Sequence, residues 1–244
     1  MLVAPRLGAD DGGRSAVVTV RRVGFMRDQR DGRRAIREFA AARGWTLTTS
    51  PEEHRAILER LHGEPFHPEP PEPSPYLVLG RRRHRLSLVM RGAHHGGSAV
   101  VFLYTAEQEV LDDGFGRRGR ELSAYWVAAL LDLPVRVPRL QVTPRTAVRP
   151  PRPGIATADP RVDERFHVHT DDPAWASRVT RALAPILLDG EGRPWRVSGT
   201  TILTWEHVLT WPPGIPLGRV DAALDELTRI TGRLSPPVQG DGPQ

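Results

Sequence analysis

The 244-residue sequence contains no cysteine, no lysine and no asparagine. The absence of cysteine excludes disulfides, thiolate nucleophiles and metal sites built on sulfur. The absence of lysine excludes Schiff-base chemistry on a lysine amine and the phosphate-loop lysine. All 34 basic side chains are therefore arginines. Together with the many Ala, Gly and Pro residues, this bias favours a GC-rich genome over a functional choice.

The chain also lacks an apolar run of about 18 residues, so we expect no transmembrane helix. Residues Met1–Arg14 have neither a basic start nor an apolar core, which argues against a secretory signal and makes the cytoplasm the expected location. The G-x-S-x-G elbow and the H-E-x-x-H helix are missing as well. The sequence therefore predicts no cofactor and no catalytic residue.

The composition predicts a packed core. Apolar residues make up 39% of the chain and charged residues 26%, which is far from the composition of a disordered protein. The length leaves one large domain or two small ones open. The net charge of +5 is compatible with an anionic partner such as nucleic acid or a lipid surface.

Apolar residues at helical spacing, together with start and stop signals, predict four helices. Ser50, Pro51 and Glu53 form a capping box at the start of one helix. Asp172 and Pro173 cap another, and glycines mark the helix ends. The predicted helices lie at residues 31–43, 51–62, 173–189 and 220–230.

Short apolar runs predict an antiparallel sheet. Gly80 and His94–Gly97 are turn signals between the early strands, so we expect a meander. The alternation of Leu86, Leu88 and Met90 with their neighbours is typical of a sheet covered on one side only. The predicted strands are Trp45–Thr48, Tyr76–Leu79, Arg85–Met90, Ser98–Tyr104, Arg139–Val142, Phe166–Val168 and one or two strands within Trp195–Trp211.

These elements predict an α+β fold, an antiparallel sheet with about four helices packed mainly on one face. We expect residues 1–30 to form a mobile N-terminal arm, residues 31–234 the globular region and residues 235–244 a disordered tail. The proline-rich residues 145–160 are a candidate boundary between two subdomains. Residues Glu121–Leu133 are ambiguous, because their length and Ala-Leu content suit a helix while the following Leu-Pro suits a strand.

Six motifs along the chain are familiar as a set. They are AARGW ending at Trp45, GEPF at Gly63–Phe66, VLG at Val78–Gly80, VVFLY at Val100–Tyr104, LPVRVPRLQVTP at Leu133–Pro144 and RFHVHTDDPAWA at Arg165–Ala176. This set resembles a family of actinobacterial proteins of unknown function, and the resemblance implies a strand at Glu121–Leu133. Many such relatives carry one or two membrane-spanning helices before the first matching helix, where this chain has only Ala16–Met26. The resemblance implies no activity or catalytic residue.

Two histidines form a candidate metal site. His167 and His169 are two residues apart, so on a strand both rings point to the same side, with Asp171 nearby as a carboxylate ligand. His94 and His95 would complete a four-ligand set if the fold brought them together. The competing interpretation is two solvated histidines, because the apolar residues of this strand are the inward-facing pair.

A glycine motif and an arginine cluster each allow two interpretations. Residues 114–119, GFGRRG, match the dinucleotide fingerprint by letter, but acidic residues separate the preceding strand from the first glycine, which favours a flexible hairpin loop. Arg81, Arg82, Arg83 and Arg85 form the densest basic cluster. Arginine forks suit phosphate contacts, whereas charge on a hairpin edge also prevents unwanted strand pairing.

We therefore expect a non-enzymatic binding or scaffold module with an unidentified protein partner. One alternative is peripheral binding to an anionic membrane surface, or to nucleic acid, through the arginine cluster. A second alternative is an enzyme of unknown class with a histidine-containing site.

Overall fold

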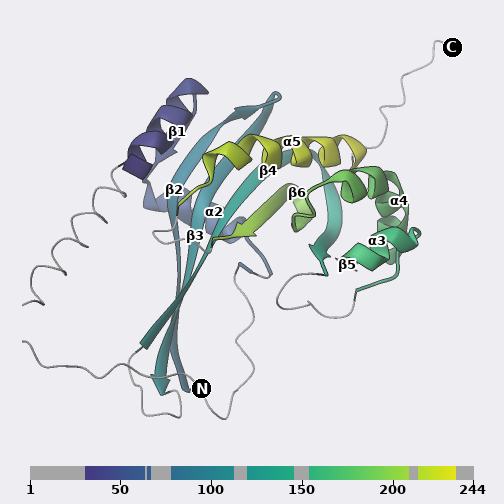
Figure 1. Cartoon of the computed structure of the whole chain (residues 1–244), viewed down its shortest axis with the longest axis horizontal. Coiled ribbons are helices and arrows are strands. Elements are labelled where there is room, and N and C mark those ends of the chain that lie inside the picture. The colour runs from purple at the N-terminus through teal and green to yellow at the C-terminus, as the bar shows by residue number, and fades with distance from the viewer. Residues whose placement is uncertain are drawn as a thin grey trace, which may run out of the picture.

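The computed structural model describes residues 31–63, 65–66, 78–112, 120–145, 154–208 and 214–234. In these residues a six-stranded antiparallel sheet packs against helices, which confirms the α+β prediction. Figure 1 shows α5 (Leu217–Leu234) lying across the sheet, with α3 (Pro160–Arg165) and α4 (Pro173–Asp189) beside the end that carries β5 (Phe166–Thr170). The predicted N-terminal arm and C-terminal tail lie outside the described residues.

The sheet is a meander that branches at its longest strand. The order is β1-β2-β3-β4-β5, and β6 also pairs with β4. Leu130 of β4 pairs with Val100 of β3 on one edge and with Leu203 of β6 on the other, so β4 is the central strand. The strands are β1 (Thr46–Thr48), β2 (Val78–His94), β3 (Gly97–Asp112), β4 (Arg120–Pro144), β5 (Phe166–Thr170) and β6 (Trp195–His207).

Five helices are present among the described residues, namely one over residues 31–42, then α2 (Pro51–Arg60), α3 (Pro160–Arg165), α4 (Pro173–Asp189) and α5 (Leu217–Leu234). The side chains of Ser50, Asp159 and Asp172 accept backbone hydrogen bonds at the starts of α2, α3 and α4, and a proline follows each cap. Proline at this position loses no helical hydrogen bond. The predicted caps of α2 and α4 are confirmed, whereas α3 falls where no helix was predicted.

The sheet separates two hydrophobic cores. The helix-side core is filled from the helix over residues 31–42, α3, α4 and α5, and the α2-side core from α2 and Phe66. The prediction of a sheet covered on one side only is therefore wrong, although four of the five helices do pack on one face. Along β3, Ala99, Val101 and Leu103 enter the helix-side core, and Val100, Phe102 and Tyr104 enter the α2-side core.

β2 runs through Gly80 without a turn, so the predicted turn there is wrong. The pairing of β2 with β3 shifts register between Ser87 and Met90, where Leu88 has a φ of 52°. This bulge inverts the alternation of side chains. Leu86 therefore enters the α2-side core and Met90 the helix-side core, although unbroken alternation would place both on one face.

β4 confirms the strand predicted for Glu121–Leu133. Its pairing with β6 shifts register between Asp132 and Leu140, a stretch that contains Pro134 and Pro138. Proline has no N–H to donate, so the ladder cannot continue regularly there. Beyond the shift β4 pairs with β5. The strands before and after residues 145–160 thus share one sheet, and the candidate subdomain boundary stays a prediction.

Candidate functional site

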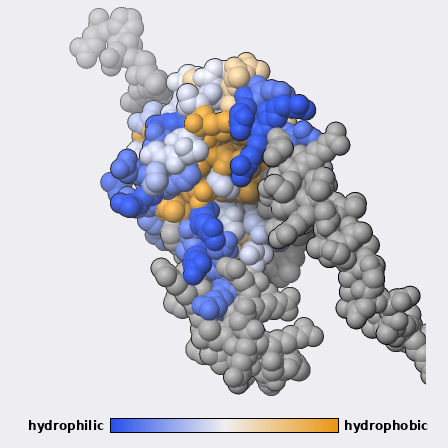
Figure 2. Space-filling model, turned by 90° about the vertical axis from the view of Figure 1, so that its left-hand side faces the viewer, coloured by the Kyte–Doolittle hydropathy of each residue, from blue (hydrophilic) through white to orange (hydrophobic). Residues whose placement is uncertain are grey.

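The outer edge of β2 is open over much of its length. β1 pairs only with Val89–Arg91 of β2, so none of the described strands pairs with the outer edge of residues 78–88. Figure 2 shows the molecule from the side where β1 and β2 lie, with hydrophilic residues bordering an apolar area. Leu47 of β1 is 39% exposed. An open strand edge offers backbone N–H and C=O groups to a partner unless charge protects it.

The predicted arginine cluster lies on this open edge. Arg83 and Arg85 are exposed; Nη2 of Arg85 lies 2.5 Å from Oε2 of Glu107 on β3. Arg83 has no ion-pair partner among the described side chains. The side chains of Arg81 and Arg82 lie outside the described set, although their backbone belongs to β2. With respect to the described side chains, the edge therefore presents one guanidinium group, that of Arg83, without an ion-pair partner.

The three residues of the predicted metal site lie on or next to β5. His167 and His169 are half-buried and pair with Thr143 and Gln141 of β4, while Asp171 is exposed. Burial lowers the pKa of His167, and the positive charge of Arg145 lowers it further. The structure does not gather these three residues into a cluster of three ligand atoms.

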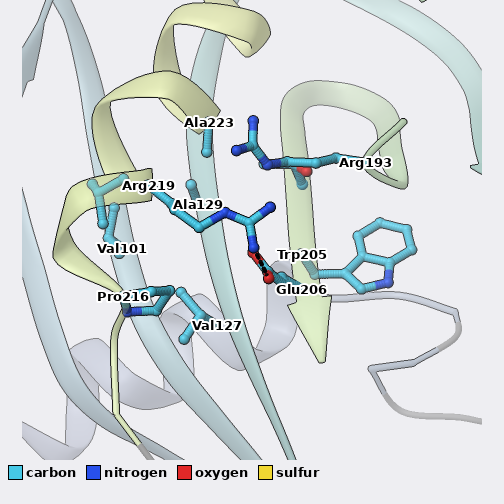
Figure 3. A pocket seen from close by; sticks show the side chains of 11 residues that line it. Val101, Val127, Ala129, Arg193, Trp205, Glu206, Pro216, Arg219 and Ala223 are labelled. Atoms are coloured by element: carbon cyan, nitrogen blue, oxygen red, sulfur yellow. Dashed lines mark hydrogen bonds and ion pairs between the residues drawn. The ribbon is translucent and has the colours of Figure 1, made fainter. Parts of the chain in front are cut away.

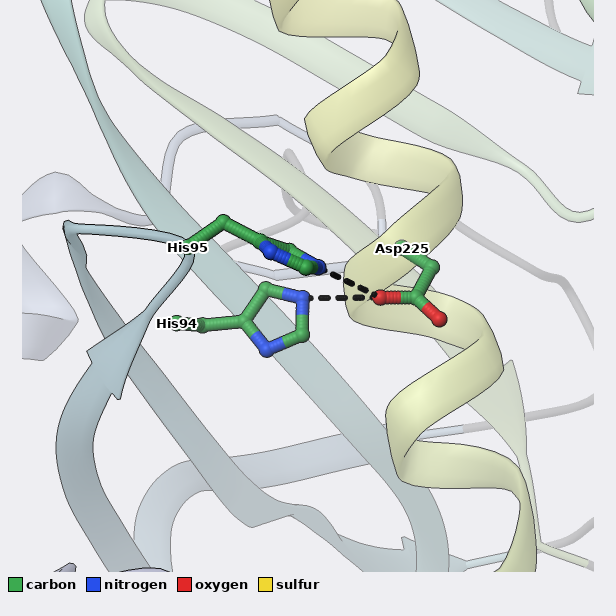
Figure 4. Close-up of side chains that lie close together, drawn as sticks. All are labelled: His94, His95 and Asp225. Carbon is green, nitrogen blue, oxygen red and sulfur yellow. Dashed lines mark hydrogen bonds and ion pairs between the residues drawn. The ribbon is translucent and has the colours of Figure 1, made fainter.

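A cluster of three ligand atoms forms elsewhere. His94 ends β2, His95 lies in the turn to β3, and Asp225 belongs to α5. Nε2 of His94 and Nε2 of His95 lie 3.0 and 3.1 Å from the same atom, Oδ1 of Asp225. Figure 4 shows both rings pointing at this carboxylate. Among the described residues this is the cluster whose composition suits a metal ion.

An ion-pair network joins α5 to the start of β6. Arg193, 8% exposed, contacts Oε2 of Glu226 at 3.1 Å and Oε2 of Glu191 at 2.7 Å. Arg219 contacts the same Glu191 oxygen at 2.9 Å and also pairs with Glu206. Figure 3 shows Arg193, Arg219 and Glu206 around a cavity of about 30 Å³. A cavity of this size holds about one water molecule and has no room for a ligand. The ion pairs therefore serve to hold α5 against the start of β6.

A second cavity, of about 190 Å³, lies between α2, β1 and β2 and includes Ile57, Arg60 and Val89 in its wall. Pockets that enclose a drug-sized ligand span roughly 300–1,000 Å³. Arg60 is already paired with Asp132 and bonded to Thr201. This cavity therefore offers little room for a ligand.

Arg196 of β6 is a buried cation in the α2-side core. Its side chain is 1% exposed, and its guanidinium carbon lies 6.0 Å from the ring centre of Phe66 and 5.6 Å from that of Trp205. Nη1 donates to Oε1 of Gln141 at 3.4 Å. Burial, followed by the charge of Arg139, lowers the pKa of Arg196 to about 10. The side chain therefore stays charged at neutral pH, stabilised in part by the ring faces.

Sequence reasoning missed Asp225 as a partner for His94 and His95. About 130 residues separate the turn from α5, and no local pattern links them. The signal that was present is the His-His-Gly-Gly turn, since two adjacent histidines at a tight turn lie at the tip of a hairpin. The glycine motif at residues 114–119 lies outside the described residues.

No protein-family model matches the chain, and no curated protein matches it. Among solved structures the chain is similar to the crystal structure of the mycobacterial trehalose monomycolate transport factor A. Sequence identity is 15% and the TM-score is 0.47, over 86% of this chain and 97% of that chain. A likeness of this size carries no functional argument, and the family resemblance of the motifs stays a prediction. No helix in the described ranges is both long and apolar enough to cross a membrane.

Proposed function

We propose that the protein is a non-enzymatic binding module that contacts a phosphate-bearing surface through the open edge of β2. The observation that carries this proposal is an exposed arginine pair, Arg83 and Arg85, on a strand edge that no described strand covers. Guanidinium groups bind phosphate oxygens with two parallel hydrogen bonds. An anionic membrane surface and a nucleic-acid backbone both present this chemistry.

The geometry supports surface contact better than chemistry in a pocket. The arginines lie on a protruding stretch of β2, β3 and β4, seen at the lower end of the sheet in Figure 1. Arg83 and Arg85 are exposed and two residues apart on β2, so their side chains point to the same face of the strand, as contact with neighbouring phosphates requires. Each phosphate contact releases counterions, so binding through this edge depends strongly on salt.

The test is sedimentation with vesicles that contain anionic lipid, and separately a gel shift with duplex DNA, each over a series of NaCl concentrations. We expect binding that weakens with salt in one of the two assays. The variant Arg83→Gln/Arg85→Gln should bind vesicles about 30-fold more weakly, at roughly 1 kcal/mol per arginine near an anionic surface. In the DNA assay the same variant should reduce the salt slope by about two.

The matched control is Arg178→Gln/Arg181→Gln, which removes the same charge from the exposed surface of α4. This variant should bind as the wild type does. Equal losses in both double variants indicate attraction to net charge alone and contradict the proposal. Binding that is indifferent to salt contradicts it as well.

A further inference from the structure

The turn between β2 and β3 brings two adjacent histidine rings together. Successive side chains on a strand point to opposite faces, but His95 has a φ of 46° and Gly96 a φ of 81°. Two positive φ angles at the centre of a two-residue loop are typical of the tight turn that hairpins favour. The ring centres of His94 and His95 are consequently 4.4 Å apart, with their planes at 73°.

The ligand atoms of these rings and of Asp225 are spaced as a small metal ion requires. Both Nε2 atoms lie within 3.1 Å of Oδ1 of Asp225, and the three ligand atoms lie within 4.8 Å of one another. Zinc bonds of about 2.0–2.1 Å in a tetrahedron place neighbouring ligand atoms about 3.3 Å apart. Only small side-chain movements separate the observed arrangement from a coordinating one.

His94 contributes a second, independent observation. Its side chain is 14% exposed, and its Nε2 atom is buried without a hydrogen bond, because the close approach to Asp225 lacks hydrogen-bond geometry. A buried polar atom without a partner costs free energy. A cation between the two rings and the carboxylate would give this nitrogen a ligand bond.

We infer that His94, His95 and Asp225 form a binding site for one divalent transition-metal ion of the zinc class. Two imidazole nitrogens and one carboxylate oxygen suit zinc, cobalt or nickel better than magnesium or calcium, which prefer oxygen ligands. His95 and Asp225 are 61% and 56% exposed, so an ion can enter from solvent. The fourth coordination position stays open to water or to a ligand from a partner.

The carboxylate is held in place from within α5. Asp221 lies one helical turn before Asp225 and pairs with Arg43 at the end of the first helix. Residues four apart lie on the same helix face, so this ion pair fixes the face of α5 that carries Asp225. A bound ion would add a second link, between α5 and the tip of the β2–β3 hairpin.

The test uses the full chain, free of any affinity tag, stripped with a chelator and titrated with zinc chloride by calorimetry. We expect one ion per chain. His95→Asn removes the ring while keeping a residue type that tolerates positive φ, and Asp225→Asn removes the charge at constant shape. Each variant should bind zinc more than about tenfold more weakly, because even outer-shell partners contribute this much. Magnesium should not compete.

The matched control is His62→Gln, an exposed histidine outside the cluster, which should leave zinc affinity unchanged. Cobalt gives a readout that depends on no variant, since tetrahedral coordination produces intense visible absorption. Wild-type protein without this absorption overturns the inference. Zinc binding of equal strength in wild type, His95→Asn and Asp225→Asn overturns it as well. The ion would then bind to other surface histidines, and His94, His95 and Asp225 would be a cluster of interacting side chains without a metal. Failure of this site leaves the proposal for the arginine edge untouched.

Discussion

Glu226 of α5 is a buried acid whose ionisation is linked to folding. Glu226 is 6% exposed. Burial raises the pKa of its carboxyl above the ordinary 4.5, and the positive charge of Arg193 opposes this effect. At pH values between 4.5 and the raised pKa, the carboxyl of Glu226 is protonated in the native state and deprotonated in the unfolded chain. The contribution of Glu226 to stability is therefore full below about pH 4.5 and falls as pH rises through this window.

Glu226→Gln tests this linkage, because it keeps the shape of the side chain and removes the titration. The difference in unfolding free energy, wild type minus variant, should be constant below about pH 4.5 and decrease as pH rises above it. Urea unfolding at a series of pH values measures the difference. Glu191, whose pKa is lowered mainly by its hydrogen bond with Arg219, is present in both proteins. A difference that increases with pH would show that Arg193 outweighs burial.

At the scale of elements, β1 is attached to β2 by an aromatic ring that packs on a glycine. Trp45 donates from Nε1 to the backbone oxygen of Ala93 at 3.0 Å. A Cβ at Gly92 would lie 2.0 Å from Cδ1 of the Trp45 ring, so the ring occupies the space that any other residue would fill. Trp45 also belongs to the helix-side core together with Ile36 and Ala40 of the first helix.

Gly92→Ala should therefore displace Trp45 and loosen β1 and the first helix. Overpacking of this kind typically costs about 1–3 kcal/mol. Chemical denaturation measures the loss. Gly97→Ala, in the paired strand of the same hairpin, is the control, because a Cβ there meets only the His94 carbonyl oxygen at 3.5 Å. Equal stability of the Gly92 variant and wild type would contradict this account of the contact.

The local sequence predicts where helices begin better than it predicts which side of the sheet a strand residue faces. Ser50 and Asp172 mark helix starts because a capping side chain and a following proline act within one turn. The bulge at Leu88 has no such local signature, yet it decides which core Leu86 and Met90 enter. The missed α3 shows a limit of a different kind, since the proline-rich surroundings of Asp159 and Pro160 masked a valid cap.

The two candidate sites also differ in whether the local sequence could predict them. Arg83 and Arg85 can be selected from sequence, because charge density is a local property. The meeting of His94 and His95 with Asp225 depends on where α5 lies across the sheet, which follows from the packing of the helix-side core and not from any nearby residue.

At the scale of the whole molecule, β3 and β4 contribute side chains to both cores. Leu130 and Leu140 of β4 are both fully buried, the first in the α2-side core and the second in the helix-side core. Because one strand crosses both cores, we expect them to unfold together. Leu130→Ala and Leu140→Ala should each cost about 2–5 kcal/mol.

Far-ultraviolet circular dichroism and tryptophan fluorescence should therefore give coincident unfolding curves with a single transition for the wild type. The two leucine variants should shift both curves equally. Two separate transitions would instead favour subdomains divided near residues 145–160.

We propose that the open edge of β2 is the surface through which this protein binds a phosphate-bearing partner. Amide hydrogen exchange, measured with and without anionic vesicles or duplex DNA at low salt, tests it directly. We predict that bound protein gains protection in residues 78–88 of β2, while the backbone of α4 exchanges as it does in the free protein. Protection confined to α4 or α5, or no change in β2 despite binding, would contradict the account.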